Sequence, residues 1–174
     1  YTLSLPDVPI SPARLTLRAA ANSLRPSNFS VNVNGATIGS LNINIIVSGN
    51  LAEQAEQDFS FSSSTATPTV TLTYSKPTSS SVGYLDYIEW QGNFNLRMRN
   101  GQIQFCNPQT VGNNAITRFN ISNASSAMKV WAITGLTTTH ALAGTLAGTD
   151  FTFSVPTDTL RHFAAFSDDQ CYAV

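Results

Sequence analysis

The sequence predicts an all-β protein, an antiparallel β-sandwich of the jelly-roll type, and three observations predict it. Polar and apolar residues alternate with a period of two along several short stretches, as they do in strands that bury one face. Turn-forming residues separate these stretches at short intervals, and almost no segment has a composition that favours helix. Many short strands with little helix are typical of a two-sheet sandwich.

The first strands are the clearest. Residues 14–18 and 29–33 both alternate without interruption, and Asn34-Gly35 follows the second stretch. This dipeptide favours a two-residue hairpin because both turn positions need a positive φ. The return strand is therefore expected over residues 36–46. Further strands are expected over residues 69–74, 84–90, 102–106, 115–121, 129–133, 151–155 and 160–166.

Residues 51–58 are the one segment whose composition favours helix, because Glu, Gln and Ala dominate it. The same segment could equally be a polar loop between two strands.

The expected strand 84–90 carries large apolar groups on both faces, which predicts a central strand. Asp86 stands among aromatic residues, so it needs a partner such as a Tyr hydroxyl, an Arg or a turn amide. Strict alternation gives one face with Tyr84, Asp86, Ile88 and Trp90 and another with Leu85, Tyr87 and Glu89.

The composition favours an extracytoplasmic protein. Charged residues make up 11% of the chain, against about 25% in average domains. The net charge of −1 leaves no basic stripe for a phosphate backbone, so nucleic acid is not expected as a partner. No apolar run approaches the roughly 20 residues of a membrane span. Because the chain opens on Tyr1 without Met or a signal peptide, we expect a piece of a longer protein.

No catalytic residue is expected. A cysteine peptidase needs a thiolate beside an imidazole, and the candidates are Cys106, Cys171, His140 and His162. Neither cysteine lies in a Gly-flanked turn that would expose its sulfur beside backbone amides, and alternation makes His162 an ordinary strand residue. The two cysteines could pair in an oxidising compartment or remain independent thiols.

No metal or cofactor is expected either. The Cys and His residues are scattered and form no zinc cluster, and no glycine loop fits a phosphate. Asp168-Asp169 is the only acidic doublet. We expect it to lie in a solvated loop, and whether it binds a cation stays open. Asp86 and Glu89 should lie on opposite faces of their strand, so they do not form the carboxylate pair of a glycosidase.

Five aromatic residues could stack on sugar rings if they were exposed, although strand aromatics more often lie in the core. They are Tyr74, Tyr84, Tyr87, Trp90 and Trp131.

Several strings carry a family resemblance. RLTLRAA and FSVNVNG (within residues 14–35), GYLDYIEW (83–90), VWAIT (130–134) and LRHFAAF (160–166) occur in this order. They resemble the region immediately before the catalytic domain in PorU-type proteins, the gingipain-related sortases of the C25 cysteine peptidase family in the type IX secretion system of Bacteroidetes. In that family the Val-Trp pair is usually followed by Asp-Val-Thr and soon a proline, whereas AITGL (132–136) follows it here. A shared fold is therefore better supported than a shared sortase role.

The resemblance implies a single jelly-roll-like module over residues 1–174, at the N-terminal side of a secreted, outer-membrane cell-surface peptidase or sortase. In such proteins the nucleophilic Cys and its His lie in a Rossmann-like domain, which would follow residue 174, so no family catalytic residue has a counterpart here. Such a parent removes sorting domains from secreted cargo and attaches the cargo to lipopolysaccharide.

The expected function is that of a non-catalytic accessory or interaction domain. Its partner would be the adjacent peptidase domain, with secreted cargo or a surface glycan as further partners. Docking would leave uncovered apolar surface on the isolated chain, near residues 83–90 or 160–166. The alternative is a stand-alone carbohydrate-binding or adhesin-like surface module.

Overall fold

The computed structural model describes residues 1–10, 12–135 and 137–168. The predicted all-β class is confirmed, because strands and isolated β-bridges account for 52% of the described residues and the sheets are antiparallel. A short 3-10 turn, Pro108–Thr110, is the only helical element of the described residues.

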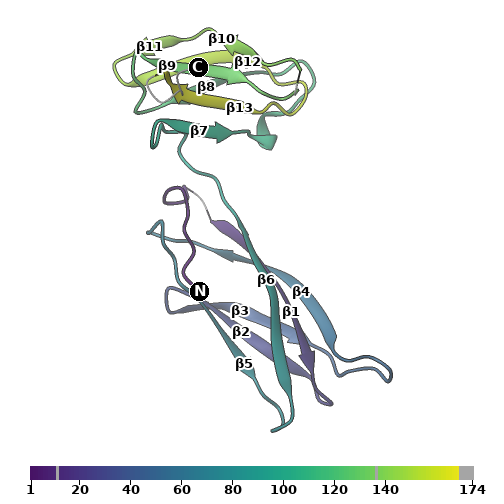
Figure 1. The fold of residues 1–174 in the computed structure, drawn as a ribbon. Helices are drawn as coiled ribbons and strands as arrows, with labels where there is room; N and C mark the ends of the chain where they lie inside the picture. Colours follow the sequence, from purple (N-terminus) through teal and green to yellow (C-terminus); the bar gives the residue numbers. More distant parts are fainter. Residues whose placement is uncertain (11, 136, 169–174) are drawn as a thin grey trace. The chain divides into compact units, whose positions relative to one another are not determined.

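The chain folds as two compact units, Tyr1–Asn95 and Leu96–Val174 (Figure 1). The sequence predicts one sandwich module over residues 1–174, whereas the structure divides the chain into two compact units. The physical reason is that each unit has a hydrophobic core of its own, and the two cores share no residue. The junction falls at Asn95 and Leu96, in a stretch that carries no linker-like run of Gly, Pro and Ser.

The Tyr1–Asn95 unit is a sandwich of two three-stranded sheets, ordered β4-β1-β6 and β3-β2-β5. Apolar residues at every second position of these strands point between the sheets, where both inner faces contribute to one core. The strands are β1 (Ala13–Asn22), β2 (Ser27–Val33), β3 (Ala36–Ile43), β4 (Glu53–Phe61), β5 (Val70–Ser75) and β6 (Val82–Gln91).

The hairpin predicted from Asn34-Gly35 is confirmed. Val33 pairs with Ala36 across the turn, and Asn34 and Gly35 have φ values of 51° and 84°. The Asn34 side chain also accepts a hydrogen bond from the backbone N–H of Thr69 at 2.9 Å. Asn34 thereby ties the hairpin to the start of β5.

The helix considered for residues 51–58 is wrong, and so is the polar loop. Most of this segment belongs to β4, which pairs with β1 from Glu53 opposite Ala21 to Phe61 opposite Ala13. Phe59 and Phe61 are buried in the core. Pairing along a whole neighbouring strand outweighs the weak helical preference of a short Glu- and Gln-rich stretch.

The prediction that strand 84–90 is central is also wrong. β1 occupies the centre of its sheet, and β6 lies at the edge. A β-bulge explains why both faces of β6 look apolar in the sequence. Arg18 pairs with Tyr87 and the next residue, Ala19, pairs with Leu85, so Asp86 is an extra residue without a partner in the ladder.

The bulge shifts the alternation of β6 by one residue. Tyr84 therefore lies on the same outer face as Tyr87 and Glu89. The pairing partners on β1 fix this assignment, with Leu85, Ile88 and Trp90 opposite the buried Ala19, Leu17 and Leu15.

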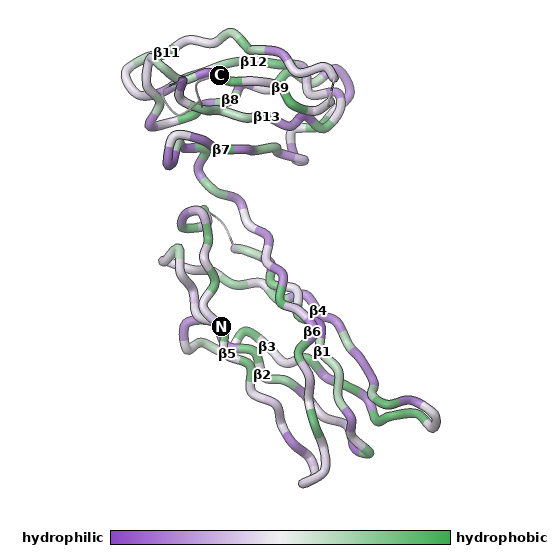
Figure 2. Tube along the Cα trace, viewed as in Figure 1, coloured by the Kyte–Doolittle hydropathy of each residue, from purple (hydrophilic) through white to green (hydrophobic). Residues whose placement is uncertain are grey.

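The second unit consists of a four-stranded sheet, β10-β9-β13-β7, and a three-stranded sheet, β11-β12-β8. The short β10 and β11 have almost no apolar alternation, and the sequence did not predict them. Figure 2 shows how hydrophobic and hydrophilic residues follow one another along the strands. The strands are β7 (Gln102–Phe105), β8 (Ile116–Ile121), β9 (Met128–Ala132), β10 (His140–Leu142), β11 (Thr145–Ala147), β12 (Asp150–Pro156) and β13 (Phe163–Ser167).

Phenylalanine dominates the core of this unit. Phe163 lies within 5.2 Å of Phe105, 5.1 Å of Phe119 and 5.5 Å of Phe153, measured between ring centroids. These four rings come from both sheets, so they join the two layers.

Candidate functional site

Cys106, His140 and His162 lie on the surface of the second unit. Cys106 follows β7, is exposed and forms no disulfide among the described residues. His140 begins β10, and its Nδ1 lies 3.2 Å from the carbonyl oxygen of Thr138. His162 precedes β13 and is exposed, so it is not the strand residue that alternation predicts. Cys171 lies outside the described residues, so its pairing with Cys106 stays a prediction.

The sheet brings one cysteine and one histidine near each other in register. Phe105 pairs with Phe163, and Cys106 and His162 are the next residues along these two strands. No hydrogen bond joins their side chains, and no carboxylate or amide orients the imidazole of His162 within the described chain. A thiol–imidazole pair that acts as a nucleophile needs both contacts.

Replacing Cys106 by Ser is therefore expected to change the stability of the chain by less than about 0.5 kcal/mol, as at other exposed positions. The purified chain should hydrolyse no peptide substrate with either residue at this position. Thermal denaturation and a fluorogenic peptide assay measure both effects. Hydrolysis that disappears in the Ser variant would identify a working thiol.

Asp168, half of the acidic doublet, forms an ion pair with Lys129 at 3.4 Å. Asp169 lies outside the described residues. Among the described residues, no group of three or more His, Cys, Asp or Glu side chains is arranged to hold a metal ion. None of the described helical segments has the length and hydrophobicity of a membrane span.

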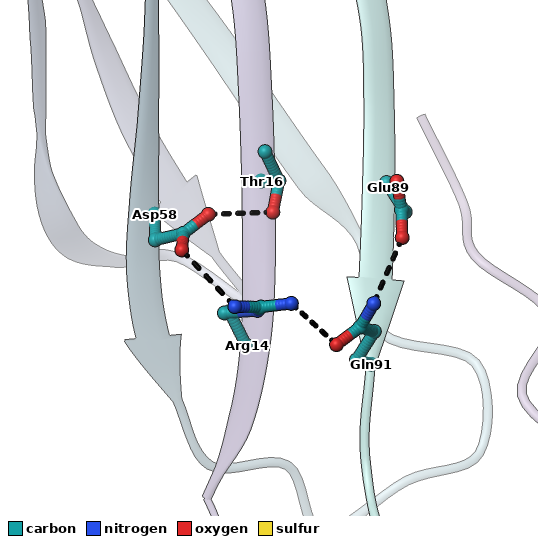
Figure 3. Close-up of polar contacts among 5 residues, drawn as sticks. All are labelled: Arg14, Thr16, Asp58, Glu89 and Gln91. Carbon is teal, nitrogen blue, oxygen red and sulfur yellow. Dashed lines mark hydrogen bonds and ion pairs between the residues drawn. The ribbon is translucent and has the colours of Figure 1, made fainter.

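The outer face of sheet β4-β1-β6 carries a network of polar side chains that contact one another. Arg14, on the central strand, joins both neighbours: its guanidinium lies 3.3 Å from the Asp58 carboxylate of β4 and also donates to Gln91 of β6 (Figure 3). Thr16 donates to the same Asp58 at 2.6 Å, and Gln91 donates to Glu89 at 3.0 Å. The network therefore runs across all three strands.

A second network lies further along the same face. Arg18 donates to Gln54 at 2.8 Å and forms an ion pair with Asp86, Nε to Oδ2, at 3.2 Å. This contact confirms the expectation that Asp86 needs a partner, and the partner is an arginine. The hydroxyl of Tyr87 donates to Glu56 at 2.8 Å.

The bulge corrects the expectation that Asp86 and Glu89 lie on opposite faces, since both carboxylates reach the outer face. Asp86 is engaged by Arg18 and Glu89 by Gln91. Neither carboxylate is left free of a donor for acid–base work on a substrate. The face as a whole is a ladder of paired groups, which holds the strands in register.

The hydrogen bond to the Glu56 carboxylate raises the pKa of Tyr87 above its ordinary value. A raised pKa means that the native state holds the phenolic proton more tightly than the unfolded chain. The contact therefore contributes stability below about pH 10, and this contribution is lost as the pH rises through the raised pKa.

Glu56→Gln is expected to lower the pKa of Tyr87 toward about 10, because it removes the charged acceptor. The measurement is the ultraviolet absorbance of ionising phenols during an alkaline titration, compared between wild type and variant. Glu89→Gln is the matched control, since Glu89 contacts Gln91 rather than a tyrosine. An identical titration curve for Glu56→Gln would contradict the assignment.

The outer face of sheet β10-β9-β13-β7 is different, because aromatic rings lie on it. Trp131 is 39% exposed, and its ring centroid lies 6.3 Å from that of Phe166. Trp131 pairs with Ala141 on one side and Ala164 on the other, so small side chains flank the indole. We call Trp131, Ala141, Ala164 and Phe166 the aromatic face. Sequence reasoning named Trp131 and, separately, the strand 160–166 that carries Phe166, but only the register of β9 and β13 brings the two side chains together.

The remaining aromatic candidates divide between core and surface. Tyr74 packs at a tilt on the buried Phe29, with ring centroids 4.9 Å apart, and Trp90 packs edge-to-face on Phe94 at 5.6 Å. Tyr84, by contrast, is 53% exposed on the outer face of its sheet. In the strand near the C-terminal end, Phe163 is buried and Phe166 lies on the aromatic face.

No family model and no curated protein matches the sequence. Among solved structures, the chain is similar to the crystal structure of dimeric latent PorU from Porphyromonas gingivalis, with a TM-score of 0.77 and 16% sequence identity. The likeness covers 99% of this chain. The chain shares its fold with part of PorU.

The matched region makes up 18% of the PorU chain, so this chain spans less than a fifth of the length of PorU. The TM-score supports, at the level of the fold, the resemblance to PorU-type proteins that the short strings indicate.

Proposed function

We propose that this chain is a non-catalytic accessory region of a cell-surface, gingipain-like cysteine peptidase or sortase of the type IX secretion system. The observation that carries the proposal is the structural likeness to PorU along nearly the whole chain. The matched part is a minor share of PorU, as expected for a region that accompanies a larger catalytic body. No hydrogen bond joins the Cys106 thiol to an imidazole among the described residues, which supports a role without catalysis.

We further propose that the aromatic face packs against the peptidase domain of the same parent protein. Trp131 is a large apolar group left partly exposed, and Phe166 lies beside it near the C-terminal end of the described chain. Aromatic side chains among small neighbours are typical of buried interface centres. The Lys129–Asp168 ion pair at its edge supplies the polar rim that such interfaces usually have.

Hydrogen exchange tests the docking. In the parent polypeptide, the amides of β9 and β13 should exchange more slowly than in the isolated chain, because a covered sheet opens less often. The edge strand β8, in the other sheet of the same unit, is the internal control. Equal exchange in the two proteins would indicate a tethered module that does not dock.

A carbohydrate-binding role is the second candidate, favoured by the exposure of Tyr84. This ring lies beside the small Ala20 of β1, with the polar side chains of Arg18 and Gln54 within the same face. Such a platform could stack on a sugar ring. If the chain binds carbohydrate, Tyr84→Ala should abolish glycan binding by the isolated chain, whereas Trp131→Ala should not. The accessory reading predicts no glycan binding by the wild-type chain.

A further inference from the structure

One end of the Tyr1–Asn95 unit exposes aliphatic side chains on two separate loops. Leu24 lies between β1 and β2 and is 79% exposed. The β3–β4 loop carries Ile45, Val47 and Leu51, which are 48%, 63% and 89% exposed. Together these groups leave much of their apolar area in water in the folded chain, so this end is suited to a contact outside it.

Hydrogen bonds show that these loops lie side by side. The backbone N–H of Ile46 donates to the carbonyl oxygen of Ser23 at 3.0 Å, and the Asn22 side chain donates to that of Leu51 at 2.9 Å. A third loop, between β5 and β6, joins them through the Ser23 and Ser81 hydroxyls, which lie 3.0 Å apart. The three loops therefore form one surface, which we call the loop tip.

The loop tip also holds two cations without partners. Arg14 and Arg18 are paired with Asp58 and Asp86 in the middle of the sheet. The other two basic residues of this unit, Arg25 and Lys76, lie in the loop-tip connections. Neither side chain has a hydrogen bond or an ion pair within the described residues.

One acidic residue, Glu53, lies at the tip, and it is occupied within its own loop. Its carboxylate accepts hydrogen bonds from the Asn50 amide at 2.9 Å and from the Val47 backbone N–H at 3.4 Å. The tip therefore combines aliphatic groups with free positive charge.

We infer that the loop tip binds the surface of an anionic lipid bilayer. Aliphatic side chains of loops can enter the interfacial layer, whereas their backbone must stay at the headgroups, where its polar groups remain hydrated. Arg25 and Lys76 would meet anionic headgroups at that level. A protein partner fits the composition less well, because the centres of protein interfaces favour Trp, Tyr and Arg over Leu and Val. This inference is independent of the docking proposed for the aromatic face.

Vesicle sedimentation of the whole chain tests the inference. The chain should bind vesicles of phosphatidylcholine mixed with phosphatidylglycerol, and bind vesicles of phosphatidylcholine alone much more weakly. Arg25→Gln with Lys76→Gln should weaken binding roughly 25-fold, at about fivefold for each charge. Leu24→Ser with Leu51→Ser should weaken it by about tenfold or more.

The matched control is Ile116→Ser with Arg118→Gln in β8, because Ile116 is 74% exposed and belongs to the other unit. This control should bind like the wild type. Failure of the wild-type chain to bind mixed vesicles would overturn the inference and leave the tip to a protein partner. An equal loss in the control would overturn it as well.

A fluorescence measurement locates the contact without relying on lost binding. Leu51→Trp should shift its emission to shorter wavelength when mixed vesicles are added, because the indole enters a less polar layer. For Ile116→Trp, adding vesicles should shift the emission no more than it does for the wild-type chain. The same spectra for both variants would contradict insertion at the tip.

Discussion

Replacing Leu17 by Ala is expected to lower the free energy of unfolding of the Tyr1–Asn95 unit by about 3 kcal/mol, within the range for buried Leu→Ala substitutions. Leu17 is fully buried in the middle of β1, the central strand of its sheet. It pairs with Gln57 of β4 and Ile88 of β6, so the neighbouring strands hold the backbone and limit collapse around the cavity.

The effect should be confined to one unit, because the two cores share no residue. The chain contains two tryptophans, and Trp90 and Trp131 lie in different units. Urea denaturation followed by Trp90 fluorescence, in a Trp131→Phe background, should show the lower midpoint. Leu24→Ala is the matched control, since the same substitution on a 79% exposed loop should cost less than about 0.5 kcal/mol. In the reciprocal Trp90→Phe background, a shift of the Trp131 signal by the same amount would contradict two separate cores.

Replacing Phe163 by Ala should destabilise the second unit by about 3–5 kcal/mol. Phe163 is 1% exposed and lies on β13, in the interior of the four-stranded sheet. Its ring contacts three other phenylalanines, so the substitution removes edge and tilted aromatic contacts besides buried area.

This second effect is read from Trp131 in a Trp90→Phe background. The Trp131 transition should move to a much lower urea concentration. In the reciprocal Trp131→Phe background, the Trp90 transition of the Phe163→Ala variant should stay in place. Ile116→Ala, at a 74% exposed position, is the control for an aliphatic truncation on the surface. A loss below 1 kcal/mol for Phe163→Ala would mean that this cluster does not hold the two sheets together.

Local pattern was enough to predict the class of fold and much of its first half. Alternation located β1 and β2, because one face of each strand is buried and the other is not. Asn34-Gly35 located the hairpin between β2 and β3, because few residues other than Asn and Gly adopt a positive φ at both turn positions.

The failures concern features that only long-range pairing decides. Most residues of β4 are polar, and they do not alternate regularly with apolar ones. β4 is a strand because it pairs with β1 along its whole length. The bulge at Asp86 inverts the faces of β6, and no local signal marks an extra residue within a continuous strand. The division into two units depends on which residues share a core, which a short, ordinary junction at Asn95 does not reveal.

The surfaces were predicted in part. The sequence named Trp131 and the strand that carries Phe166, but their contact needs the β9–β13 register. Arg25 and Lys76 are two of nine basic residues in the sequence, and nothing there distinguishes them from the paired Arg14 and Arg18.

Docking through the aromatic face is the central claim, and a titration in trans tests it most directly. The chain, supplied separately, is titrated into the remainder of the parent polypeptide. Trp131→Ser is compared with Val111→Ser, a control at a similar exposure of 42%. We expect saturable binding of the wild type and the control, and at least about tenfold weaker binding of Trp131→Ser, as for a central interface residue. Equal affinity for all three, or no binding of the wild type, would contradict the claim.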